Sequence, residues 1–179
     1  MIDTTLAKRY AKALVDIGLE NDTLDKYGAD LSEFTQLIES SRDLKEVLIS
    51  PVFTKEDKKK IADDVLVKMS ADPMVVNFIN VLIDRKRIDQ LAGIDAAFAT
   101  KVDEIRGITR GEVISAEPLS DEELNQVTEA LSNLSGKKVE LKTKVDEYLI
   151  GGLFAKVGDM VFDGTIRTQL NQLKESLKG

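Results

Sequence analysis

The segment YLIGGLFAKVGDMVFDGTIR, residues 148–167, carries the strongest local structural signal in the chain. It has the pattern of two apolar strands joined by a Gly-Asp turn at Gly158. A second turn at Gly164 then leads into a short amphipathic segment. A glycine in the first position of a two-residue turn suits a type II′ hairpin, because that position needs a positive φ. The segment therefore predicts a β-hairpin followed by a helix.

The residues before this hairpin predict the rest of a small α+β unit. Residues 112–117 have the composition of a strand, and Ser120 with Glu123 forms a capping box that starts a helix. Gly136 is placed to cap the end of that helix, and residues 139–145 alternate between apolar and charged side chains. A closing helix is predicted from the spacing of Ile166, Leu170, Leu173 and Leu177. The unit has roughly 70 residues, near the lower size limit for independent stability.

The first half of the chain has a helical pattern almost throughout. Residues 54–57 look like a capping box, and Asp72 followed by Pro73 is a strong helix start. Six helical segments follow one another up to Gly107. The sequence predicts an α+β fold with a six-helix all-α bundle at residues 1–106, a linker at 107–111 and the small α+β domain at 112–179.

The first helix has an unusually wide apolar surface. The apolar side chains between Leu6 and Gly18 cover an arc of about 200°, whereas a surface helix needs little more than about 100°. We expect Leu6, Tyr10 and Ile17 to pack in the bundle. The part built on small residues, Ala7, Ala11 and Gly18, is expected to admit another helix at close range.

The helix that begins after Asp72 has a similar excess of apolar surface. Between Met74 and Ile83 only Asn77 and Asn80 are polar, and Val81 lies beside this narrow strip. One interpretation is a central helix that its neighbours bury on all sides. The other is a groove, shared with the first helix, that binds an amphipathic helix of a partner.

Composition excludes several classes of function. The chain has no cysteine and no histidine, so it lacks the usual thiolate and imidazole nucleophiles, bases and metal ligands. A net charge of −7 disfavours nucleic-acid binding. The glycines of residues 151–158 fail the spacing of a phosphate-binding loop, and the acidic pairs are explained by helix capping or solvated faces. We therefore expect no catalytic residue, no cofactor and no metal site.

No segment is predicted to insert in a membrane. The most apolar stretch, residues 74–83, falls well short of the roughly 20 residues that a spanning helix needs. The N-terminus has no apolar core and no cleavage site of a secretion signal. The chain is expected to be cytoplasmic, with any membrane association made through partners.

Five segments of the chain together resemble one protein family. They are residues 7–14 (AKRYAKAL), residues 77–82 (NFINVL) followed by Arg87-Ile88, residues 113–120, residues 136–139, and residues 145–164. Their order and spacing closely resemble the delta-subunit family of bacterial ATP synthases, to which the mitochondrial oligomycin-sensitivity-conferring protein is related. The resemblance covers nearly the whole chain.

The resemblance implies a non-catalytic stator subunit of a rotary, proton-translocating ATP synthase. In that family the helical bundle binds the N-terminal helix of an alpha subunit between helices one and five. The C-terminal domain contacts the end of the b-subunit stalk, on the cytoplasmic face of the bacterial inner membrane. By position, the resemblance places Tyr10, Ala11 and Leu14 on one wall of the groove and Asn77 and Val81 on the other.

Two other functions remain open on the residues alone. The chain could be a helical adaptor for another helical client. It could also be a small enzyme with its site in the C-terminal domain, which the absence of histidine and cysteine disfavours.

Overall fold

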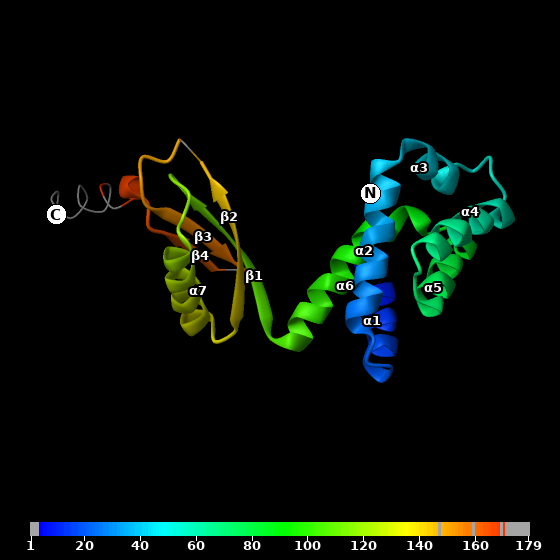
Figure 1. Ribbon diagram of the computed structural model, residues 1–179, viewed down its shortest axis with the longest axis horizontal. Coiled ribbons are helices and arrows are strands. Elements are labelled where there is room, and N and C mark those ends of the chain that lie inside the picture. Colours follow the sequence, from blue (N-terminus) through cyan, green and yellow to red (C-terminus); the bar gives the residue numbers. More distant parts are fainter. Residues whose placement is uncertain (1–3, 147, 159, 169, 171–179) are drawn as a thin grey trace. The chain divides into compact units, whose positions relative to one another are not determined.

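The computed structural model describes residues 4–146, 148–158, 160–168 and 170. The chain divides into two compact units, Met1–Val102 and Asp103–Gly179. The described part of the first unit is helical, and that of the second holds a four-stranded sheet (Figure 1). The predicted α+β class is confirmed.

The first unit is built from helices that pack around one apolar core. The helices are α1 (Thr4–Glu20), α2 (Leu24–Ser40), α3 (Arg42–Ile49), α4 (Lys55–Lys68), α5 (Pro73–Asp84), the short 3-10 helix η1 (Ile88–Gln90) and α6 (Leu91–Arg106). Three of these helices begin where a side chain accepts a backbone N–H, at Ser41, Thr54 and Asp72. The core includes Leu14, Leu31, Phe34, Leu66, Ile79, Ile94 and Phe98.

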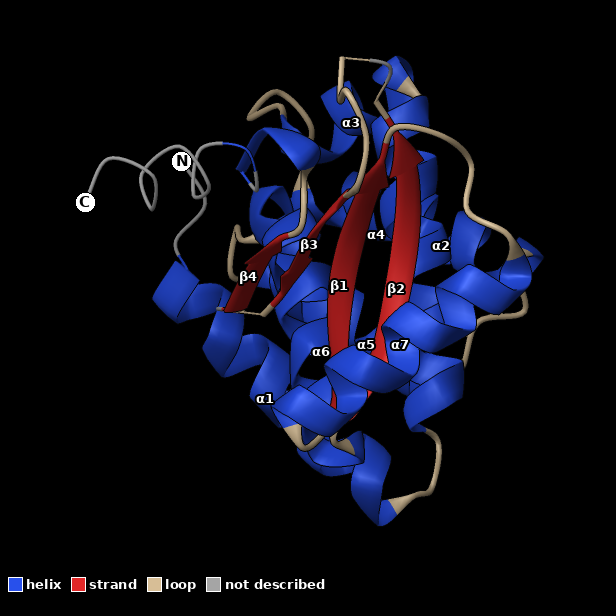
Figure 2. Cartoon of the chain, turned by 90° about the vertical axis from the view of Figure 1, so that its left-hand side faces the viewer, coloured by secondary structure: helices blue, strands red, loops and turns tan. Residues whose placement is uncertain are grey.

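In its described residues, the second unit has a mixed sheet with a helix packed against it. Its elements are β1 (Ile108–Ser115), α7 (Asp121–Ser135), β2 (Lys138–Val145), β3 (Leu153–Val157) and β4 (Met160–Asp163). The strand order is β2-β1-β3-β4 (Figure 2). The pairing of β1 with β2 is parallel, with α7 as the crossover, and the other two pairings are antiparallel.

The apolar core of the second unit includes residues from α7 and from one face of the sheet. Val113, Val139 and Ala155 are buried there together with Leu131 of α7. Because side chains alternate along a strand, Ile114 and Phe154 lie on the opposite face. The capping box of Ser120 and Glu123 is present, and Gly136 ends α7 with a φ of 67°. Both helix signals were correctly predicted from the sequence.

The expected linker at 107–111 is mostly strand. Gly107 ends α6 with a φ of 66°, and β1 begins at the next residue. Gly111 interrupts the apolar pattern for a packing reason. A Cβ at Gly111 would lie 2.7 Å from Val157 Cγ2 and 2.8 Å from the Lys156 carbonyl oxygen. The sheet therefore needs a glycine at this position, and the strand begins four residues earlier than the sequence suggested.

The predicted hairpin of residues 153–163 is confirmed. Val157 pairs with Met160 across its turn, and Gly158 has a φ of 58°. Asp159, the second turn residue, lies outside the described residues, as does most of the closing helix predicted up to Leu177.

No described helix has both the length and the apolar character needed to cross a membrane.

Candidate partner-binding sites

Helices α1 and α5 meet through two aromatic rings. The rings of Tyr10 and Phe78 contact each other edge to face, with centroids 6.3 Å apart and an interplanar angle of 74°. Asn77 is exposed, and Val81, one turn along α5, is 46% exposed. Tyr10, Asn77, Phe78 and Val81 are called the α1–α5 surface below.

Two of the five sequence-predicted site residues are not on this surface. Leu14 is 0% exposed, and Ala11 is buried beside it in the core of the first unit. Neither side chain offers area to a partner in this structure. The structure thus leaves Tyr10, Asn77 and Val81 accessible, while the partner role of Ala11 and Leu14 stays a prediction.

The small-sided part of α1 faces inward, and the helix that approaches it closely belongs to the chain itself. A Cβ on Gly18 would lie 2.8 Å from Leu24 Cδ2 and 3.2 Å from Tyr27 Cδ2, so α2 is the helix that approaches there. Ala7 and Ala11 are likewise buried, whereas Leu6, Tyr10 and Ile17 are only half-buried. The close approach that small residues permit is used within the chain, while Tyr10 and Ile17 pack, partly buried, against the core of the bundle, as expected.

Helix α5 is not buried on all sides. Val75, Ile79, Leu82 and Ile83 lie in the core, but Val81 and Asn77 are exposed. The other polar residues of α5 are bound within the chain. Asn80 Nδ2 donates to Asp63 Oδ1 at 2.9 Å, and Asp84 Oδ2 lies 2.7 Å from Lys59 Nζ. Asn77 has no hydrogen-bond partner among the described residues, so its amide is available to a partner.

Sequence reasoning overlooked Phe78 as a member of the surface. In the sequence, Phe78 is one of many apolar positions between Met74 and Ile83. Its position next to Asn77 could have indicated this. Neighbouring residues on a helix point about 100° apart, so the side chain of Phe78 can lie at the edge of the exposed strip that contains Asn77.

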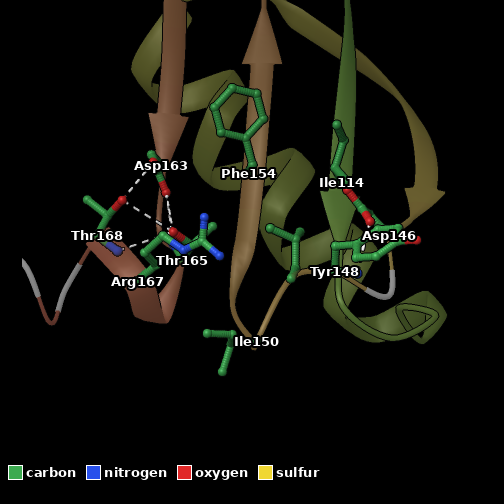
Figure 3. A pocket seen from close by; sticks show the side chains of 10 residues that line it. Ile114, Asp146, Tyr148, Ile150, Phe154, Asp163, Thr165, Arg167 and Thr168 are labelled. Atoms are coloured by element: carbon green, nitrogen blue, oxygen red, sulfur yellow. Dashed lines mark hydrogen bonds between the residues drawn. The ribbon is translucent and has the colours of Figure 1, made fainter.

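The second unit has a hollow of about 340 Å³ at one end of its sheet (Figure 3). Ile114 of β1 and Phe154 of β3 form an apolar wall, and the segment after β2 adds Tyr148, Leu149 and Ile150. The remaining lining residues are polar or charged: Asp146, Asp163, Thr165, Arg167 and Thr168. None of these lining residues was predicted as a site residue, because the hollow is formed in part by loops whose path the strand pattern does not determine.

Asp163 holds the turn after β4 in place through three hydrogen bonds. Its Oδ1 accepts from the Thr165 backbone N–H at 3.0 Å and from Thr165 Oγ1 at 2.8 Å. Its Oδ2 accepts from Thr168 Oγ1 at 2.8 Å. The bonds from Thr165, and then that from Thr168, hold the pKa of this carboxyl below its ordinary value of 3.8.

This arrangement predicts a dependence of stability on pH. Because the folded state lowers the pKa of Asp163, the carboxylate stabilises the second unit above pH 3.8, and this contribution is lost as pH falls through the lower, folded-state pKa. The urea midpoint of this unit, followed from pH 7 downward, should therefore decline at the acid end. Asp163→Asn should remove part of that decline, whereas Glu129→Gln, at an exposed position on α7, should leave it unchanged. Equal pH curves for the wild-type and Asp163→Asn chains would contradict the assignment.

Comparison with known proteins decides the family. The sequence model of the family described as "ATP synthase delta (OSCP) subunit" matches residues 6–177. The chain belongs to the ATP synthase delta (OSCP) subunit family. It is a stator component of an ATP synthase and not one of its catalytic subunits, as the sequence predicted.

Curated relatives within the delta (OSCP) family match along their full length. The chain is 44% identical over 178 residues to the ATP synthase subunit delta of Geobacter metallireducens, with 99% of each chain covered. It is 40% identical over 179 residues to that of Desulfotalea psychrophila, covering 100% of this chain and 99% of the relative.

A solved structure shares the fold of this delta-family chain. One chain of the Toxoplasma gondii mitochondrial ATP synthase hexamer, solved by cryo-electron microscopy, superposes with a TM-score of 0.69. The match covers 97% of this chain and 98% of that one, at 23% sequence identity.

Proposed function

We propose that the α1–α5 surface binds the N-terminal helix of an ATP synthase alpha subunit. In this proposal residues 1–106 work as a six-helix, alpha-binding domain. The supporting observation is the exposure of Val81 beside the Tyr10–Phe78 pair, an apolar area next to exposed Asn77, whose side-chain amide has no hydrogen-bond partner in the part of the chain that the structure describes. An amphipathic helix could cover the apolar part and hydrogen-bond to Asn77.

Ala11 and Leu14 have an indirect role in this proposal, because both are buried inside the bundle. Both lie on α1 next to Tyr10, and Leu14 is fully buried. We assign them the task of fixing the position of α1 so that the Tyr10 ring stays against Phe78. Direct contact with the alpha subunit would require α1 to rotate.

The C-terminal domain, residues 112–179, is proposed to bind the end of the b-subunit stalk. The apolar wall of Ile114 and Phe154, with exposed Tyr148 and Ile150 beside it, supports this region as the contact. Binding at both domains would join the catalytic head to the peripheral stalk, so that the head resists rotor torque. The chain would then sit at the cytoplasmic face of the bacterial inner membrane, held there by its partners.

Val81→Asp tests the alpha-binding proposal. The full chain is titrated with a peptide of the alpha-subunit N-terminus in a calorimeter. Placing a carboxylate at the centre of an apolar contact should weaken binding by about thirtyfold, equivalent to about 2 kcal/mol. Because Val81 is 46% exposed, the helical content of the bundle should stay unchanged.

The matched control is Val67→Asp on α4, where the valine is 71% exposed and lies outside the α1–α5 surface. It should bind the peptide as the wild-type chain does. Unchanged binding by Val81→Asp would exclude this surface, and lack of binding by the wild-type chain would exclude this partner.

A further inference from the structure

A second hollow in the first unit lies away from the α1–α5 surface. It has a volume of about 550 Å³ and lies where the α3–α4 connection passes the end of α5 and the start of η1. The buried side chains of Leu48, Ile83 and Ile88 line it, and the more exposed Ile49 and Phe53 stand at its edge. An open apolar cavity of this size is large enough for one or two large side chains of a partner.

Three ammonium groups and one carboxylate also line this hollow. Lys55 Nζ donates to the Asp84 carbonyl oxygen at 2.8 Å. The ammonium groups of Lys58 and Lys86 have no hydrogen-bond or ion-pair partner among the described residues. Asp89 is the one acidic lining residue. The hollow is thus locally cationic in a chain whose net charge is −7, and its charge favours an acidic partner.

The shape of this region favours a chain segment over a compact small molecule. A smaller hollow of about 70 Å³ shares Leu48, Ile49, Ile88 and Asp89 with the first one, so apolar surface continues along α3. Val52, between two lining residues of the first hollow, is 82% exposed. Exposed apolar surface that continues beyond a cavity is typical of contacts between proteins.

We propose that this lysine-rimmed hollow docks an acidic segment of another subunit of the ATP synthase. A large apolar side chain of that segment fills the space over Leu48, Ile83 and Ile88. Asp or Glu residues next to it in sequence pair with Lys58 and Lys86. The proposal rests on membership of the ATP synthase complex, and it is independent of the surface at α1 and α5.

Photocrosslinking in the assembled ATP synthase tests this contact. The photoreactive residue p-benzoylphenylalanine replaces Val52, the complex is irradiated, and the adducts are identified by mass spectrometry. The expected result is a crosslink to another subunit within a segment that has a large apolar residue flanked by Asp or Glu. The same residue at Val67, which is 71% exposed but outside the hollow, should give no such adduct.

Charge reversal tests the role of the lysines. Lys58→Glu with Lys86→Glu should lower the yield of the Val52 crosslink about tenfold, because attraction to the acidic segment becomes repulsion. The control pair, Lys60→Glu with Lys68→Glu, changes two exposed lysines of α4 outside the hollow and should keep the yield.

Three results would overturn the docking proposal: no protein adduct at Val52, an adduct with lipid alone, or a yield that the Lys58 and Lys86 reversal leaves unchanged. Each result leaves the alpha-peptide titration of Val81→Asp unaffected. The two proposals can therefore fail separately.

Discussion

Replacing Gly152 by alanine should unfold the C-terminal unit. A Cβ at this position would lie 2.3 Å from the Gly164 carbonyl oxygen and 2.9 Å from Thr165 Cα. Both atoms belong to the backbone, so no side-chain rotation can relieve the clash. Gly152 also has a φ of 82°, which alanine adopts at a cost. We expect a loss of about 3 kcal/mol or more, a large fraction of the stability of so small a unit.

The backbone near Gly152 cannot easily move away from the added methyl group. The Ile166 N–H donates to the Gly151 carbonyl oxygen at 3.1 Å, and the Gly164 N–H donates to the Leu153 carbonyl oxygen at 2.9 Å. These two hydrogen bonds hold the segments on either side of the clash together. Separating the segments would break both bonds and displace the start of β3.

Gly136→Ala is the matched control for this change. Gly136 has a φ of 67°, but nothing lies within 4 Å of a Cβ built there. Its replacement therefore measures the conformational cost alone, about 1 kcal/mol. Hydrogen exchange of the β1–β4 amides should show lost protection in Gly152→Ala and near-native protection in Gly136→Ala. Similar exchange in the two variants would disprove the steric argument.

Leu14→Asp should unfold the helical unit. The Leu14 side chain is 0% exposed, and a carboxylate in its place would be buried without a partner. Such a change is expected to cost about 4 kcal/mol or more. Far-UV circular dichroism should show a large loss of helix, together with a lowered thermal midpoint.

Leu19→Asp provides the comparison on the same helix. Leu19 is exposed near the end of α1, so its replacement should keep the helical signal. A folded Leu14→Asp chain would contradict the burial of this residue. If Leu14→Asp does unfold the chain, a loss of peptide binding by this variant gives no information about the partner site. Val81→Asp should keep the fold and therefore tests the site directly.

Local signals allowed much of the fold to be predicted. The helix start at Asp72-Pro73 and the capping box at Ser120 depend on residues within a few positions of each other. The hairpin around Gly158 likewise needs only a turn residue and two flanking apolar strands. In each case the residues that predict the helix start or the turn are the same residues that form it.

The features that the sequence could not predict depend on contacts between distant residues. The helical period of α1 shows how wide its apolar arc is, but not that Tyr27 and Leu24 of α2 take the side that carries Gly18. Gly111 resembles a linker residue until Val157 is placed beside it. The helical period likewise could not show that the side chains of Ala11 and Leu14 are buried in the core of the first unit, and their partner role stays a prediction.

The position of β1 in the sheet has a consequence for synthesis on the ribosome. It is made first among the four strands, yet it lies between β2 and β3. The later of these two strands, β3, ends at Val157. Until both strands have emerged, the two edges of β1 lack their native hydrogen-bond partners. The helical unit needs only residues up to Val102 and can fold earlier. A nascent chain whose emerged part ends before Lys138 would thus hold a folded helical unit followed by a strand able to pair with other nascent chains.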